Sequence, residues 1–445
     1  MRFSTTELAV QLGGELIGPD VTVDGASIDS RTVAPGQLFV PIVAERDGHD
    51  FIPAALRAGA LAYLTSRTPE GATAVVVEDT ATALMNCGVA ARRRLAGGAV
   101  GITGSVGKTT TKDLVQRCLS ASFRTAASER SFNNELGLPV TLVNAPDDAE
   151  WVVLEMGARG LGHIARLALV ARPDVGIVTS VAMAHVEYFG DLDGVARAKS
   201  ELVEALPASG VAVLNFDDPR VARMAGASPC PVLGYALEAD AEVRAEDVVC
   251  DDELLPSFRL VTPWGKGDVR LSLHGVQQVP NALAAAAAAL WCGVPLESVT
   301  TSLEAVTASP LRMELRHPPD GPVLLVDCYN ANPASVEATL RALARLPSGR
   351  RVAILGLMAE LGVDTAEEHQ RMSTLAGALG IDVRGYQTDL YGSEVIGGLD
   401  EAVAFLRSLR PDAAVLLKGS RVARLEDVLE GYGRAGGAPS RPSGE

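Results

Sequence analysis

Short apolar runs alternate with amphipathic stretches along most of the chain, and this alternation predicts its secondary structure. The stretch at 193–206 is a clear helix, because Val195, Leu202 and Leu206 recur at helical spacing among charged residues. Strand-like apolar runs lie at 98–103, 151–154, 175–180, 323–327, 352–356 and 414–417. Strands that alternate with helices form parallel sheets covered by those helices. We therefore expect a mixed α/β fold.

The length of the chain and its turn-rich breaks predict three domains. The chain has 445 residues, and a domain averages ~150 residues. A Thr-Ala-Ser-Pro turn ending at Pro310 marks the second boundary. We expect a small N-terminal α/β domain over 1–82, a central P-loop parallel-sheet domain over 83–308 and a C-terminal Rossmann-like α/β domain over 309–435. Residues 436–445, rich in Gly, Pro and Ser, are expected to form a disordered tail.

A glycine-rich loop at 103–110, Thr-Gly-Ser-Val-Gly-Lys-Thr-Thr, follows an apolar strand and opens a helix. Glycines let backbone N–H groups turn toward phosphate oxygens, the helix N-terminus adds a positive dipole end, and Lys108 supplies a mobile cation. The alternative is a structural turn with a solvated lysine, but the strand-loop-helix context favours a nucleotide site. The residues expected to hold ATP phosphates are Gly104, Ser105, Gly107, Lys108, Thr109 and Thr110.

Polar residues also follow two of the other predicted strands. Glu155 comes directly after the run at 151–154, and His185 comes shortly after the run at 175–180. Each alone is most simply a solvated surface residue. In an open parallel sheet, however, ligands gather beyond the carboxyl ends of the strands. We therefore expect Glu155 and His185 to serve Mg²⁺ beside the phosphate loop, together with the hydroxyl of Thr109.

Lys199 lies within the apolar stripe of the helix predicted at 193–206. One interpretation is a snorkelling side chain, whose stem packs on apolar neighbours while the ammonium reaches water. The other is a buried amine with a lowered pKa, which is available for reaction or modification. Periodicity alone favours the first interpretation, and both stay open at this point.

Composition excludes several classes of protein. A net charge of −16 argues against a broad nucleic-acid footprint, and 47% hydrophobic with 21% charged residues is typical of a soluble globular protein. The six cysteines show no C-x-x-C spacing that would indicate a zinc site or a disulfide framework. The N-terminus lacks the apolar core of a signal peptide, and the apolar run at 282–291 is too short to cross a bilayer. We expect a cytoplasmic protein without a nucleic-acid partner or a membrane span.

The motifs, in their order along the chain, resemble those of the Mur ligase family, and the resemblance covers nearly the whole length. It rests on the segments 103–110, 131–139, 155–157, 184–185, 198–201, 327–333, 358–362 and 418–420. The family's own variant of the phosphate loop accounts for Gly101, which lies one position before the usual glycine. Three departures are Gln277-Gln278 where the family often has His-Asn, Leu357 where an aspartate is usual, and the segment 44–47, Ala-Glu-Arg-Asp, which is one residue short and lacks the expected glycine.

The resemblance implies roles for single residues. Lys199 would be carbamylated, which turns a buried cation into a carboxylate-like Mg²⁺ ligand beside Glu155 and His185. Asn281 would face the adenine and Asp327 the ribose of ATP. The catalytic residues would be Lys108, His185, Lys199 and Arg312, with Arg312 also on the phosphates. The substrate-binding residues would be Ser30 and Arg31 for the uridine nucleotide, Asn133 and Asn134, and Tyr329, Asn330, Lys418 and Ser420 near the incoming amine.

The resemblance also implies a reaction. The protein would be an ATP- and Mg²⁺-dependent amide ligase that adds D-alanyl-D-alanine to UDP-N-acetylmuramoyl-tripeptide through an acyl phosphate, and we expect it to act as a monomer. A related ligase that joins a different carboxylate and amine is one alternative. A P-loop ATPase or kinase and a non-catalytic nucleotide-binding scaffold are others. Activity with another acid but not with the tripeptide nucleotide would indicate the related ligase. Phosphate release without an added amine would indicate the ATPase or kinase, and failure to bind ATP would indicate the scaffold.

Overall fold

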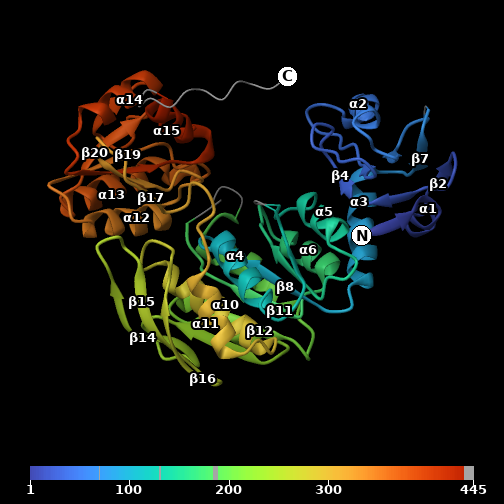
Figure 1. The fold of residues 1–445 in the computed structure, drawn as a ribbon, viewed down its shortest axis with the longest axis horizontal. Coiled ribbons are helices and arrows are strands. Elements are labelled where there is room, and N and C mark those ends of the chain that lie inside the picture. Colours follow the sequence, from blue (N-terminus) through green and yellow to red (C-terminus); the bar gives the residue numbers. More distant parts are fainter. Residues whose placement is uncertain (70, 130–131, 184–188, 435–445) are drawn as a thin grey trace.

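The computed structural model describes all of residues 1–445 except 70, 130–131, 184–188 and 435–445. Two outer regions lie on either side of a central one (Figure 1). Within the described residues, no helix combines the length and the apolar character that a membrane span requires. The mixed α/β class predicted from the sequence is confirmed, whereas the tail at 436–445 lies outside the described residues.

The N-terminal region contains a five-stranded sheet in the order β2-β7-β6-β5-β4, in which only β2 pairs antiparallel. A separate antiparallel pair joins β1 (Arg2–Ser4) to β3 (Thr22–Asp24). The sheet strands are β2 (Glu15–Ile17), β4 (Ala26–Ser27), β5 (Leu38–Phe39), β6 (Ala62–Thr65) and β7 (Thr73–Val76), and the helices are α1 (Thr5–Leu12), α2 (Ile52–Arg57), preceded by the 3₁₀ turn Gly48–Phe51, and α3 (Thr80–Arg94).

The central region is built on a nine-stranded sheet in the order β16-β15-β14-β13-β12-β11-β8-β10-β9. It is parallel from β9 to β14 and ends in an antiparallel β14-β15-β16 meander. The strands are β8 (Gly98–Thr103), β9 (Thr125–Ala127), β10 (Trp151–Glu155), β11 (Val175–Val178), β12 (Val211–Asn215), β13 (Val232–Ala236), β14 (Val243–Cys250), β15 (Pro256–Thr262) and β16 (Gly265–Arg270). The helices are α4 (Lys108–Leu119), α5 (Gly137–Asn144), α6 (His163–Ala171), α8 (Leu192–Glu204), α9 (Pro219–Arg223), α10 (Gln278–Trp291) and α11 (Leu296–Glu304).

Helix α10 packs beside α4 and against the strands β12, β13 and β14. Its residues 282–289 are fully buried, and all of them except Leu283 are alanines. Small side chains let the backbone of a helix approach its neighbours closely, so the alanine run makes this helix a central packing element. One consequence is that Asn281, at the start of the run, is placed beside the phosphate loop.

The C-terminal region contains a six-stranded sheet in the order β17-β18-β22-β19-β20-β21, which is parallel except for the edge strand β17. Apolar side chains on its two faces belong to two separate hydrophobic clusters. The strands are β17 (Glu314–Arg316), β18 (Val323–Val326), β19 (Arg350–Leu355), β20 (Asp382–Tyr386), β21 (Glu394–Ile396) and β22 (Ala413–Lys418). The helices are α12 (Pro333–Arg345), α13 (Thr365–Ala378), α14 (Leu399–Ser408) and α15 (Leu425–Arg434).

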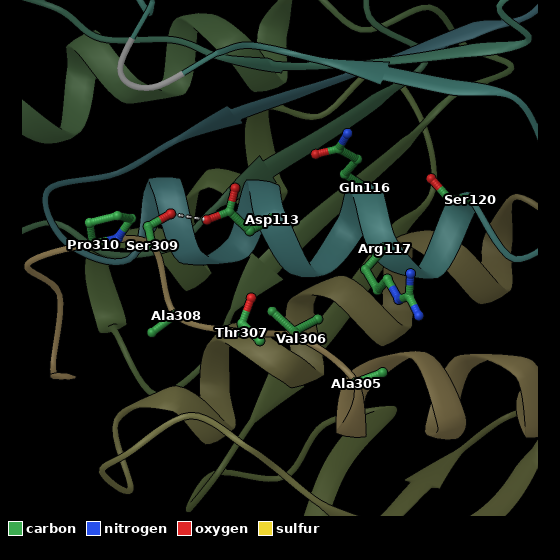
Figure 2. A pocket seen from close by; sticks show the side chains of 10 residues that line it. All are labelled: Asp113, Gln116, Arg117, Ser120, Ala305, Val306, Thr307, Ala308, Ser309 and Pro310. Atoms are coloured by element: carbon green, nitrogen blue, oxygen red, sulfur yellow. Dashed lines mark hydrogen bonds between the residues drawn. The ribbon is translucent and has the colours of Figure 1, made fainter. Parts of the chain in front are cut away.

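The linker between the central and C-terminal regions runs along the outer side of α4. The Oγ of Ser309 donates a hydrogen bond to the carboxylate of Asp113, and the ammonium of Lys112 pairs with the same carboxylate at 2.8 Å. Beside this contact lies a cavity of about 490 Å³, lined by α4 and residues 305–310 (Figure 2). The linker is therefore tethered to the helix that begins at Lys108.

Candidate active site

A cavity of about 540 Å³ lies where the carboxyl ends of the central strands face the C-terminal region. The predicted site residues that line it come from both regions. They are Gly104, Ser105, Gly107, Lys108, Thr109, Thr110, Asn133, Asn134, Glu155, Lys199, Asn281, Arg312, Asp327, Tyr329, Asn330 and Lys418. His185 lies outside the described residues. Ser30, Arg31 and Ser420 do not line this cavity.

The loop between β8 and α4 has the backbone that a phosphate cradle needs. Gly104 and Gly107 have φ angles of 149° and 89°, a region that side chains disfavour. A Cβ on Gly104 would lie 1.8 Å from the Oγ1 of Thr179, and one on Gly107 would lie 2.4 Å from the Oδ1 of Asn281. Both glycines are therefore required by conformation and by close approach.

Lys108 is the first residue of α4, and its ammonium donates to the carbonyl oxygen of Gly104 at 2.7 Å. Burial lowers the pKa of Lys108, the carboxylate of Glu155 raises it, and the guanidinium of Arg312 lowers it again. These charges interact across the cavity although Arg312 belongs to the C-terminal region. Two cations that face one cavity create a strong site for a polyphosphate.

Glu155 ends β10 and is 2% exposed. The Oγ1 of Thr109 donates to its Oε2 at 2.8 Å, and the Nδ2 of Asn133 donates to its Oε1 at 2.9 Å. A carboxylate and a hydroxyl side by side supply the hard oxygen ligands that Mg²⁺ prefers. In the described part of the chain, no group of three or more His, Cys, Asp or Glu side chains is arranged so that it could hold a metal ion by itself. This donor set fits an ion that takes one or two protein carboxylates and completes its shell with phosphates and water.

Lys199 lies on α8 and is 7% exposed, so its ammonium does not snorkel to bulk water. Burial lowers its pKa to about 7, and the nearby charge of Lys108 contributes in the same direction. Its neighbours Val195, Leu202 and Val203 on the same stripe are buried as predicted. A large fraction of this amine is neutral near pH 7, and a neutral amine is a nucleophile.

The C-terminal wall of the cavity contains a buried ion pair. The Nζ of Lys418, which is 1% exposed, donates to the carboxylate of Asp327 and at 3.0 Å to the carbonyl oxygen of Asn330. Asp327 also accepts from the backbone N–H of Met313 at 3.2 Å. The guanidinium of Arg312 stacks 4.1 Å from the centre of the Tyr329 ring. Asp327 and Lys418, which the sequence assigned to different ligands, thus form one unit.

The side chains of Ser420 and Arg31 bind to residues of their own regions. The Oγ of Ser420 donates to the carbonyl oxygen of Ala331 at 3.2 Å and accepts from the N–H of Ala359 at 2.9 Å, and the side chain is buried. Arg31 pairs with Asp29 at 2.6 Å and is exposed, next to Ser30. Hydrogen bonding by Arg31 lowers the pKa of Asp29 to about 2. Contacts of these residues with a substrate stay predictions.

Sequence reasoning missed cavity residues that the strand-end rule also covers. Thr179 and Ser180 follow β11, and Ser180 accepts through its Oγ from the N–H of Val106 at 3.1 Å. Asn215 ends β12 and donates to the carbonyl oxygen of Thr179 at 2.8 Å. The rule that selected Glu155 would have selected these three residues as well.

A glycine-rich loop after a parallel strand, with a buried carboxylate at the next strand end, defines a P-loop nucleotide-binding protein. Comparisons with known proteins narrow this class. Residues 102–289 match the Mur ligase middle domain, and residues 311–421 match the glutamate ligase domain of Mur ligases. The chain belongs to the Mur ligase family.

Individual relatives extend the similarity over the whole chain. The UDP-N-acetylmuramoyl-tripeptide–D-alanyl-D-alanine ligase of Mycobacterium tuberculosis (strain H37Rv) is 37% identical, covering 90% of this chain and 90% of that protein. The ligase of the same name from Escherichia coli (strain K12) is 33% identical over 95% and 97%. MurF from Acinetobacter baumannii superposes with a TM-score of 0.90 at 27% identity over 97% and 99%. MurF ligase from Thermotoga maritima, solved in complex with ADP, gives 0.83 at 28% identity over 93% and 98%.

Proposed function

We propose that this protein is an ATP-dependent amide ligase that adds D-alanyl-D-alanine to UDP-N-acetylmuramoyl-tripeptide during synthesis of the peptidoglycan precursor. The observation that carries the proposal is the cavity in which the phosphate loop, Glu155 and Lys199 of the central region face Arg312 of the C-terminal region. Relatives that bear this activity in their names align over nine-tenths or more of both chains, which supports this substrate pair.

The reaction has two steps. A carboxylate oxygen of the tripeptide attacks the γ-phosphorus of ATP, the bond between that phosphorus and the β,γ-bridging oxygen breaks, and ADP leaves an acyl phosphate. The free amine of D-alanyl-D-alanine then attacks the acyl carbon, loses a proton and displaces inorganic phosphate. Phosphoryl transfer needs positioning and charge neutralisation more than covalent help from the protein. Lys108 and Arg312 supply the charge.

The Mg²⁺ ligands in this proposal are the hydroxyl of Thr109, the carboxylate of Glu155 and a carbamate on Lys199, with His185 as a further ligand. Bound Mg²⁺ neutralises the phosphate charges. The lowered pKa of Lys199 supports its modification, because only the neutral amine attacks CO₂. The carbamate also removes an unfavourable buried ammonium next to Lys108.

The lining of the cavity supports the nucleotide and substrate contacts that the family resemblance implies. Asn281 beside Gly107 is the contact proposed for the adenine, and Asp327, held by Lys418, is the one proposed for the ribose. Asn133 and Asn134 are proposed to face the muramoyl peptide, and Tyr329 and Asn330 the amine. A monomeric state and a cytoplasmic location stay predictions.

Release of ADP and phosphate by the purified protein tests the proposal. The assay contains Mg²⁺ and ATP with the tripeptide nucleotide, D-alanyl-D-alanine, both or neither, and mass spectrometry identifies the product. We expect turnover only with both substrates, and the pentapeptide nucleotide as product. Turnover with another acid or amine but not with this pair would assign the chain to a related ligase. Release without any amine would indicate an ATPase.

A further inference from the structure

His369 on α13 is a completely buried histidine that the mechanism above does not use. Its Nε2 accepts a hydrogen bond from the backbone N–H of Met358 at 2.9 Å, and its Nδ1 lies 2.5 Å from the carbonyl oxygen of Thr365. A carbonyl can only accept and an N–H can only donate. The ring is therefore neutral, with its proton on Nδ1.

The segment that His369 holds, residues 356–359, is hydrogen-bonded at every residue. The N–H of Gly356 donates to the carbonyl oxygen of Lys418 at 2.8 Å. The N–H of Ser420 donates to the carbonyl oxygen of Leu357 at 2.9 Å. The N–H of Ala359 donates to the Oγ of Ser420 at 2.9 Å. The phenol of Tyr391, which packs against the His369 ring, donates to the carbonyl oxygen of Gly356 at 2.9 Å.

This segment supports the end of β22, and the end of β22 forms part of the cavity wall. Lys418 is the last residue of β22, lines the cavity and holds the carboxylate of Asp327. Ser420 connects the same segment to Ala331, beyond the strand end that carries Asp327. Residues 356–359 thus connect the buried imidazole of His369, which accepts from Met358, to Lys418 in the wall that faces the phosphate loop.

We infer that His369 is a positioning residue of the ligase: its unprotonated Nε2 fixes residues 356–359 and, through them, the Lys418–Asp327 pair. The inference rests on the proposed function and deepens it. It assigns control of the C-terminal wall to a side chain that does not line the cavity and touches no substrate.

The charges around His369 decide what protonation does. Glu368, its neighbour on α13, is turned to Arg371 in an ion pair of 2.9 Å. On the other side lies the Tyr391 ring, 4.8 Å away between centres, and burial raises the pKa of its phenol, so it carries no charge. Burial lowers the pKa of His369, and the carbonyl of Thr365 and the charge of Glu368 raise it in part. A proton added to Nε2 would face the N–H of Met358, so two donors would meet and this hydrogen bond would be lost. Residues 356–359 would therefore be held less firmly in acid.

Two substitutions distinguish the role of Nε2 from that of Nδ1. In His369→Gln the side-chain oxygen reaches the position of Nε2 and accepts from Met358, but it does not titrate. In His369→Asn the amide reaches only the position of Nδ1, so it bonds to Thr365 and leaves the Met358 N–H without its partner. The two variants remove the same ring and bury amides of the same chemistry.

The test measures kcat/KM of wild type and both variants from pH 5 to 8, well below their melting temperatures. We expect His369→Asn to lose about tenfold, His369→Gln to stay within about threefold, and the acid limb of the wild-type profile to flatten in His369→Gln. Equal activity of the two variants, or an unchanged acid limb in His369→Gln, would overturn the inference.

Hydrogen–deuterium exchange of the peptide that contains residues 356–361 gives a readout without turnover. Protection is expected in wild type and His369→Gln at pH 7 and a loss of protection in His369→Asn. Equal protection in all three proteins would overturn the inference even if the enzyme is active. Loss of protection in His369→Asn together with inactivity of wild type on the proposed substrates would instead contradict only the proposed function.

Discussion

At the residue scale, the most informative side chain is Lys199. The proposed carbamate on it would supply a carboxylate at the end of a long side chain. A small acid that diffuses into the space left by truncation would then replace that carboxylate. We predict that Lys199→Ala lowers kcat about 100-fold or more and that formate or acetate restores part of it. Methylamine serves as the control additive, and Lys266→Ala, on the exposed meander strand β16, as the control variant. Full activity of Lys199→Ala without any acid would contradict the carbamate.

The same lysine predicts a dependence of stability on pH. Its pKa falls from the ordinary 10.5 to about 7 in the folded chain. Below pH 7 it is protonated in both the folded and the unfolded chain, and the buried charge lowers the free energy of unfolding. From pH 7 to 10.5 the unfolded chain binds the extra proton, so this cost fades as pH rises.

Replacement of the charge should therefore stabilise the protein while destroying its activity. We predict that Lys199→Met, in CO₂-free buffer at pH 6, unfolds with a free energy ~3 kcal/mol higher than wild type. The gain should shrink toward pH 10. Urea unfolding at both pH values measures it, and a gain that does not change with pH would show that Lys199 is not buried as a cation.

At the element scale, the phosphate loop depends on glycine for two separate reasons, its positive φ and its close neighbours. We predict that Gly104→Ala lowers the affinity for ADP more than about tenfold, because the new methyl group meets Thr179 and displaces the loop. Gly380→Ala is the matched control, since Gly380 also has positive φ but no atom within 4 Å of the added Cβ. Calorimetric titration with ADP measures both, and equal affinities would contradict the prediction.

The elements themselves could be predicted from the sequence, but side-chain pairings in the site could not. The strand at 98–103 and the helix that starts at Lys108 appear as predicted, because periodicity and glycine placement are local signals. The rule that ligands lie beyond strand ends placed Glu155 in the cavity. By contrast, Lys418 and Asp327 are 91 positions apart, and no local pattern indicates that strands β18 and β22 are neighbours. Ser420 belonged to a motif, yet only tertiary packing turns it away from the cavity.

At the scale of the whole molecule, the hydrogen bond between the linker and α4 restricts the movement of the C-terminal region relative to the central region. Ser309→Ala removes the hydrogen bond to Asp113 without changing a residue that lines the proposed ATP site. We predict a larger radius of gyration by small-angle X-ray scattering for the unliganded variant than for wild type, and the same radius for both when substrates are bound. Ser120→Ala, on the same side cavity, is the control (Figure 2). Identical radii without ligand would contradict the role of the tether.

The outer regions differ in how much of their hydrophobic core they share with the central region, and so in how easily each could be replaced by another domain. Buried side chains of the N-terminal region, such as Phe3 and Leu84, belong to one hydrophobic cluster with Leu138 and Val152 of the central region. The C-terminal sheet has its own clusters, to which the rest of the chain contributes Leu254. In evolution or engineering, the C-terminal region, which is proposed to face the amine substrate, could thus be replaced as one module at the linker. Replacing the N-terminal region, which is proposed to bind the uridine nucleotide, requires repacking the hydrophobic cluster that it shares with the central region. Substrate diversity should therefore accumulate more easily in the amine than in the uridine nucleotide.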